Sequence, residues 1–135
     1  MEIKISKIEG IGPVSAEKLA AAGVLTVERL LQTGATKAGR KKLAADSNID
    51  EGKILDWVNM ADLFRIRGVG PQFAELLKAS GVDTIKELRN RNAENLYERL
   101  VEVQKEKKIT RVVPALKRVT YFVDQAKKLD PVVKY

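Results

Sequence analysis

The sequence predicts an all-α protein made of two tandem units related by internal duplication. Residues 8–31 align without gaps to residues 66–89, and 12 of these 24 aligned pairs are identical, where chance would give roughly one or two. Apolar residues recur at the 3.6-residue spacing of amphipathic helices, and no long stretch has the period of two that is typical of a strand. Repetition and periodicity therefore indicate the same small helical unit twice.

A second, weaker match sets the boundaries of the units. Residues 54–61 resemble residues 119–126 at an offset of 65, whereas the first match has an offset of 58, so the second unit carries seven extra residues. We place the extra residues within 104–113, where Lys and Arg are dense. We expect a first unit over residues 1–65, a second unit over residues 66–129 and a loose C-terminal tail over residues 130–135.

Local signals predict the first three helices of each unit. Pro13 and Pro71 suit the first turn of a helix, where a missing N–H would be unpaired in any case. Gly23 and Gly81 are placed to end these helices in the left-handed conformation. Side chains that can accept the unpaired N–H groups of a following helix then stand before the second helices (Thr26, Thr84) and the third helices (Thr36, Asn92).

Apolar spacing predicts the remaining helix faces. The third helix of the second unit shows Leu96, Leu100 and Val103, and the fourth shows Leu116, Val119, Val123 and Ala126. The first unit offers Ile54, Val58 and Ala61. Trp57 and Phe122 occupy matching positions, and we expect both to lie in the core. The lead from Ile3 to Ile5 fits either a short extended segment or the start of a helix.

The composition excludes most familiar enzyme chemistry. The chain has neither Cys nor His, which removes disulfides, thiolate nucleophiles, Cys-type zinc sites and the usual general base. Carboxylates are scattered, with no catalytic pair and no metal-ligand cluster. No run approaches the roughly 18 apolar residues of a membrane span, and no signal-peptide core follows Met1. We expect a soluble, cytoplasmic, non-enzymatic protein without a cofactor or small-molecule substrate.

The excess positive charge lies in the second half of the chain. The net charge is +7, which favours an acidic partner, nucleic acid first and an anionic membrane second. Residues 1–65 hold ten basic and nine acidic side chains, whereas residues 66–135 hold fifteen and nine. Residues 105–118 alone hold six basic side chains and one acidic side chain. A smaller cluster, Arg40 to Lys42, faces acidic residues from Asp46 to Glu51, so we expect it to be a screened, solvated helix face.

One motif occurs in both units. The pattern apolar-x-Gly-apolar-Gly-Pro-x-x-Ala-x-x-Leu spans residues 8–19 and again 66–77. Two glycines around one apolar residue allow a tight hairpin whose backbone can approach a ligand, with Ile11 or Val69 pointing inward as an anchor. The hairpin leads into a helix N-terminus, where unpaired N–H groups and the helix dipole favour a phosphate oxygen. A dinucleotide site is a poor alternative, because the third glycine and the preceding strand are missing.

The pattern resembles the helix-hairpin-helix motif of DNA-repair and recombination proteins. That resemblance implies non-specific binding to duplex DNA by paired hairpins, sometimes with a monovalent cation on the hairpin carbonyls. The continuation Gly-Val-x-Thr-Val/Ile also resembles the paired-hairpin, SAM-like domain at the C-terminus of bacterial RNA polymerase alpha subunits. This layout implies a second, degenerate hairpin at residues 46–50 of unit one and 107–113 of unit two. Over nearly its full length the chain resembles a bacterial domain family of unknown function, which implies architecture and no activity.

The chain departs from the DNA-binding pattern. Many such hairpins place Lys, Arg or Thr after the second glycine, whereas this chain has Val14-Ser15 and Gln72-Phe73. Glu9 beside the first hairpin repels phosphate, whereas Arg65 and Arg67 suit the second. Phe73, in the position of Ser15, is a candidate contact for a partner or for the other unit. The alternative to DNA binding is a protein-interaction or scaffold module in which the hairpins only turn the chain.

The sequence thus predicts non-sequence-specific binding to double-stranded DNA. Hairpin N–H groups would receive phosphates, and basic side chains would add further phosphate contacts. The expected contact residues are Arg65, Arg67, Gly68, Val69, Gly70, Gln72, Lys107, Lys108, Arg111, Lys117 and Arg118 in the second unit, and Gly10, Ile11 and Gly12 in the first.

Overall fold

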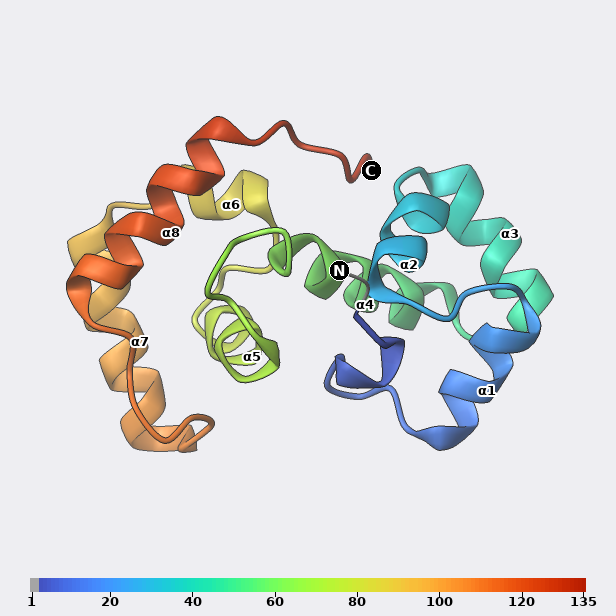
Figure 1. Cartoon of the computed structure of the whole chain (residues 1–135), viewed down its shortest axis with the longest axis horizontal. Coiled ribbons are helices and arrows are strands. Elements are labelled where there is room, and N and C mark those ends of the chain that lie inside the picture. The colour runs from blue at the N-terminus through green and yellow to red at the C-terminus, as the bar shows by residue number, and fades with distance from the viewer. Residues whose placement is uncertain (1–2) are drawn as a thin grey trace. The chain divides into compact units, whose positions relative to one another are not determined.

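The computed structural model describes residues 3–135, and the all-α prediction is confirmed there (Figure 1). An isolated bridge joins Lys4 to Thr26, and the lead then forms a short 3-10 helix, so it is extended first and helical second. The elements of the described residues are η1 (Ile5–Lys7), α1 (Pro13–Ala21), α2 (Val27–Gly34), α3 (Lys37–Ser47), α4 (Glu51–Leu63), α5 (Pro71–Ala79), α6 (Ile85–Arg89), α7 (Ala93–Lys107) and α8 (Leu116–Lys128). Among these helices, none is long and apolar enough to cross a membrane.

The chain divides into two compact units. The first runs to Asp62 and also includes Val132–Tyr135, and the second is Leu63–Pro131. The boundary thus lies three residues before the expected one. The reason is local, because Leu63 is fully buried and its carbonyl accepts a hydrogen bond from the Ile66 N–H (3.1 Å), which ties it to the segment that follows.

Unit one is held by helices packed on a shared apolar core. Helix α3 packs against α1 and α2, and α1 also contacts η1. Helix α4 approaches the end of α2 so closely that a side chain in place of Gly34 would clash with Val58. Trp57 is buried, as predicted, together with Leu19, Leu30, Leu43 and Ile54.

Unit two is centred on α8, which packs against α6 and α7, while α5 packs against α7. Phe122 is fully buried on α8, as predicted. The expected apolar faces of α7 and α8 are buried except for Leu116, which is 39% exposed at the first turn of α8. The core therefore runs along one face of α8 and leaves the start of that helix open to solvent.

The predicted caps are confirmed. Proline occupies the first turn of α1 and of α5, and the glycines that follow these helices, Gly23 and Gly81, have φ values of 88° and 93°. Thr26 and Thr84 accept hydrogen bonds of 3.1 Å from the N–H groups three residues on, as do Thr36 and Asn92. These interactions act within a few residues, which is why the sequence alone could place them.

The connection between the third and fourth helices differs between the units. Asn48 and Lys108 both adopt left-handed conformations (φ 56° and 49°) and end α3 and α7. Helix α7 has 15 residues and α3 has 11. Residues 108–115 join α7 to α8 in unit two, whereas only residues 48–50 join α3 to α4 in unit one. The extra residues of unit two thus lengthen α7 and its loop, in agreement with the expected position within 104–113.

The C-terminal residues are bound to unit one, which corrects the expectation of a loose tail. The Lys134 N–H donates to the Ala35 carbonyl (2.7 Å), the Tyr135 hydroxyl donates to Asn59 Oδ1 (2.9 Å), and Val133 is buried. The tail has no regular secondary structure of its own, and the Lys134 N–H pairs with a carbonyl of unit one instead.

Arg40 binds this tail through its side chain. This corrects the expectation that Arg40 lies on a solvated helix face. Its guanidinium donates to the carbonyls of Gly34 (2.8 Å), Ala35 (3.3 Å) and Lys134 (2.8 Å), and it is only 3% exposed. It also lies 5.9 Å from the centre of the Tyr135 ring. The expected screening is present at Lys42, whose Nζ lies 2.9 Å from Asp46 Oδ2.

Candidate nucleic-acid interface

The Gly-apolar-Gly segments of both units have the same backbone conformation. Gly10 and Gly68 have φ values of 93° and 91°. The N–H groups of Ile11 and Val69 each donate over 3.2 Å to the carbonyl three residues earlier. Both apolar side chains are buried, which confirms their role as anchors. Ile11 and Val69 therefore hold the hairpins in place and offer no side chain to a ligand.

The first glycine of each hairpin is exposed, but the side on which a Cβ would stand faces the protein's own core. A Cβ on Gly68 would lie 3.1 Å from Phe122 Cε1, and one on Gly10 would lie 3.4 Å from Trp57 Nε1. Around Gly12 and Gly70, in contrast, no atom lies within 4 Å of the corresponding position. A side chain at the second glycine would therefore meet open space.

The second glycine also leaves the following helix uncapped by a side chain. Gly70 is the N-cap of α5, and its carbonyl accepts a hydrogen bond from the Ala74 N–H (2.9 Å). The N–H groups of the first turn, at Gln72 and Phe73, have no partner within a helix by geometry. Gln72 is exposed. An anion could thus reach this turn without displacing a side-chain cap.

The Gly-apolar-Gly segment of unit two, residues 68–70, is called hairpin two here, and residues 10–12 of unit one are called hairpin one. Hairpin two lies against one face of α8. The Gln125 side-chain amide pairs with both backbone groups of Arg67: the Arg67 N–H donates to Oε1 (2.9 Å), and Nε2 donates to the Arg67 carbonyl (3.0 Å). Gly68 lies over Phe122. Arg118, Phe122 and Gln125 are spaced i, i+4 and i+7, so they share this face of the helix. Arg118 therefore lies on the same face of α8, one turn before Phe122, which Gly68 contacts.

Gln125 was missed by the sequence analysis. The only sequence clue is a contrast with unit one, where Met60 occupies the corresponding position at the offset of 65. A thioether cannot pair with both backbone groups of a neighbouring residue, so hairpin one lacks this clamp.

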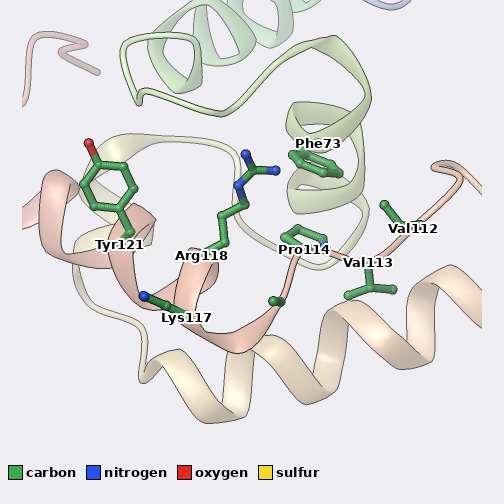
Figure 2. A pocket seen from close by; sticks show the side chains of 8 residues that line it. Phe73, Val112, Val113, Pro114, Lys117, Arg118 and Tyr121 are labelled. Atoms are coloured by element: carbon green, nitrogen blue, oxygen red, sulfur yellow. The ribbon is translucent and has the colours of Figure 1, made fainter.

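The starts of α5 and α8 meet at one pocket of about 490 Å³ (Figure 2). Phe73 from the first turn of α5 lines it together with Lys117 and Arg118 from the first turn of α8. Figure 2 shows the Arg118 side chain extending from α8 to the side of Phe73. The Phe73 ring also packs against Phe122, with centroids 6.4 Å apart. The first turn of α5 and these two basic residues therefore line the same pocket.

A second glutamine clamp shapes the loop before α8. The Thr110 N–H donates to Gln104 Oε1 (3.0 Å), and Gln104 Nε2 donates to the Thr110 carbonyl. The Thr110 hydroxyl donates to the Val112 carbonyl (2.7 Å). These bonds hold a segment that carries Arg111 and leads to the pocket residue Val112.

The remaining predicted basic residues are placed unequally. Arg67, Arg111, Lys107 and Lys108 are exposed, and no ion pair among residues 3–135 includes them, Lys117 or Arg118. Lys107 and Lys108 end α7, where cations also stabilise the helix dipole, and they do not line the pocket. Arg65 is half-buried, and its Nη1 donates to the Asp130 carbonyl (2.9 Å), so it supports the fold.

Hairpin one repeats the backbone conformation with fewer cations around it: Lys53 matches Arg118 at the offset of 65, but Gly52 stands where unit two has Lys117. Glu9 is exposed beside Gly10, and α4 begins with Glu51 at the position of Leu116. Ser15 stands where unit two has Phe73. Hairpin one therefore offers the same N–H groups with less positive charge beside them.

Comparison with known protein families gives one result. A family model described as a domain of unknown function, DUF4332, matches residues 9–129. The chain belongs to this family. The DUF4332 match covers both units, in agreement with the resemblance to a domain family of unknown function, and its description names no activity. No curated protein and no solved structure matches this DUF4332 chain significantly. Across residues 3–135, no group of three or more acidic side chains could hold a metal ion.

Proposed function

We propose that this DUF4332 chain is a tandem duplication of a paired helix-hairpin-helix unit and binds double-stranded DNA through its second unit. In support of the duplication, Ile5, Ile8 and Ile11 repeat the turns of Leu63, Ile66 and Val69 at the offset of 58. The protein acts in the cytoplasm by binding alone, without catalysis. The observation that carries the DNA proposal is the single face on which the start of α5 meets Lys117 and Arg118.

The mechanism follows from two helix starts on that face. The N–H groups after Gly70 receive one phosphate, and Lys117 and Arg118 attract another at the start of α8. Arg67 and Arg111 are exposed and add further positive charge to unit two. Neutralising about four to six phosphates predicts a slope of roughly −4 to −5 for log affinity against log salt. The DNA sequence is not read, because no described element is shaped to enter a groove and contact base edges.

The test is fluorescence anisotropy with a labelled duplex of about 20 base pairs, at about 50 mM and about 200 mM salt. The double variant Lys117→Gln with Arg118→Gln is compared with Lys127→Gln plus Lys128→Gln, which removes the same charge from the other end of α8. We expect the first variant to lose about tenfold in affinity and about two units of salt slope, and the control to lose little of either.

Two results would overturn the proposal. Absence of binding at the lower salt concentration removes the DNA function. Equal losses for the two double variants would show that only net charge matters, and the assigned face would then be wrong.

A protein-interaction module is the second candidate, and one observation favours it. Val112 and Tyr121, which line the pocket, are 66% and 49% exposed. Exposed apolar side chains around a pocket are typical of partner contacts as well as of ligand sites. This candidate predicts that the charge variants leave partner binding unchanged, whereas Tyr121→Ser weakens it.

A further inference from the structure

The pocket of unit two is apolar, although phosphate binding requires only charge and N–H groups. Phe73, Val112, Val113, Pro114 and Tyr121 contribute most of its lining. Its volume of about 490 Å³ falls within the range of roughly 300–1,000 Å³ that is typical of small-ligand sites. A uniform duplex backbone would leave this apolar surface unused.

The charged residues that line the pocket are both basic. Lys117 and Arg118 line it, and no lining residue is acidic. The preceding loop adds Arg111, which is exposed next to Val112. The occupant must therefore combine an apolar, flat or compact part with negative charge.

A nucleotide base with its own phosphate has this combination. Aromatic rings and the planar guanidinium of Arg can stack on a base whatever its identity. Tyr121 and Arg118 both line the pocket from α8, and Figure 2 shows the Arg118 side chain next to Phe73 of α5, so the pocket offers planar groups for such stacking. An apolar peptide would fill the same volume but would bring no charge to match the two cations.

We propose that this pocket binds a nucleobase displaced from the duplex stack. The domain then prefers DNA with an unpaired base, such as a bulge, a gap or a frayed end, to intact duplex. The proposal rests on the DNA function proposed above and names the substrate class of the same face. Unpaired bases are favoured because their extraction needs little unstacking energy.

The experiment uses the full chain and two labelled duplexes that differ by one bulged adenine. We expect about tenfold tighter binding to the bulged duplex, a gain within the measured range for base stacking on an aromatic side chain. With 2-aminopurine as the bulged base, its fluorescence should change when the protein is added, because the base enters a new stack.

The variants Tyr121→Ser and Val112→Ser should abolish the preference while leaving affinity for intact duplex within about twofold. The matched control is Val14→Ser, since Val14 is 67% exposed and Val112 is 66% exposed, yet Val14 lies in unit one. Circular dichroism confirms that each variant is folded.

The outcomes separate the two proposals. Failure to bind either duplex overturns the DNA function itself. Binding both duplexes equally, without a change in 2-aminopurine fluorescence, leaves the DNA function intact and overturns the base pocket. A preference that survives Tyr121→Ser places the unpaired base elsewhere and also overturns the pocket assignment.

Discussion

Gly68 and Gly70 are two positions apart, yet a side chain would meet different surroundings at each. Gly68 combines a φ of 91° with a core phenylalanine beside it, whereas Gly70 has an extended backbone and open space around it. Left-handed backbone costs a residue other than glycine of the order of 1–2 kcal/mol. The first glycine therefore serves folding, and the second keeps a helix start open.

Serine substitutions separate these two roles. Gly68→Ser should lower the free energy of unfolding by about 1–3 kcal/mol, as measured by urea denaturation. Gly70→Ser should leave stability unchanged or raise it slightly, because serine is a good N-cap. Its hydroxyl would, however, occupy the N–H group that we assign to phosphate, so duplex affinity should fall. Gly12→Ser is the control in unit one, and a matching loss of affinity there would contradict the assignment to unit two.

Helices and loops of unit two are joined by two glutamine clamps. Gln125 on α8 holds the hairpin before α5, and Gln104 on α7 holds the loop before α8. Each amide forms the pair of hydrogen bonds with a backbone N–H and carbonyl that a neighbouring strand forms in a sheet, and residues 3–135 contain no sheet. The two segments that present the candidate interface are thus positioned by side chains from neighbouring helices.

Replacing Gln125 by Met, the residue at the matching position of unit one, should loosen hairpin two. Loss of two hydrogen bonds predicts a decrease of about 1–3 kcal/mol in the free energy of unfolding. Hydrogen exchange at the Arg67 amide should accelerate, and duplex affinity should decrease with it. Met60→Leu is the control substitution at the equivalent site. Unchanged exchange at Arg67 would show that the clamp contributes nothing to hairpin order.

The molecule as a whole is electrostatically asymmetric. The observed boundary after Asp62 assigns Arg65 to unit two and Lys134 to unit one. These two exchanges cancel, so the net charge is +1 for unit one and +6 for unit two, as for the two halves of the sequence. Unit one instead carries the C-terminal residues, held by a buried arginine. The two units thus differ in charge, with most of the net positive charge in unit two.

The tail should contribute to the stability of unit one. Val133→Ser removes a buried side chain, and we expect a loss of about 1–2 kcal/mol in the free energy of unfolding. Hydrogen exchange should accelerate at the Lys134 amide, which donates to Ala35, before it changes in α7 or α8. The exposed Val112→Ser is the matched control, with little expected effect on stability. Equal exchange in both variants would show that the tail is not a stabilising part of unit one.

Interactions within about four residues of one another could be read from the sequence. The helix-starting prolines, the left-handed glycines and the Thr and Asn caps all belong to this class, and so does the apolar periodicity that predicted the buried faces of α7 and α8. The repeat also allowed the extra residues of unit two to be placed in the α7–α8 connection, because an insertion shifts the offset wherever it occurs.

Contacts between distant residues required the folded chain. Arg67 and Gln125 are 58 residues apart, Asn59 and Tyr135 are 76 apart, and Arg40 and Lys134 are 94 apart. Nothing in a local pattern distinguishes a buried arginine from an exposed one, so Arg40 and Arg65 were expected at the surface. The pocket likewise depends on how α5 and α8 pack. The physical reason is that capping and periodicity are short-range properties of the backbone, whereas burial and pairing depend on which distant segments the core brings together.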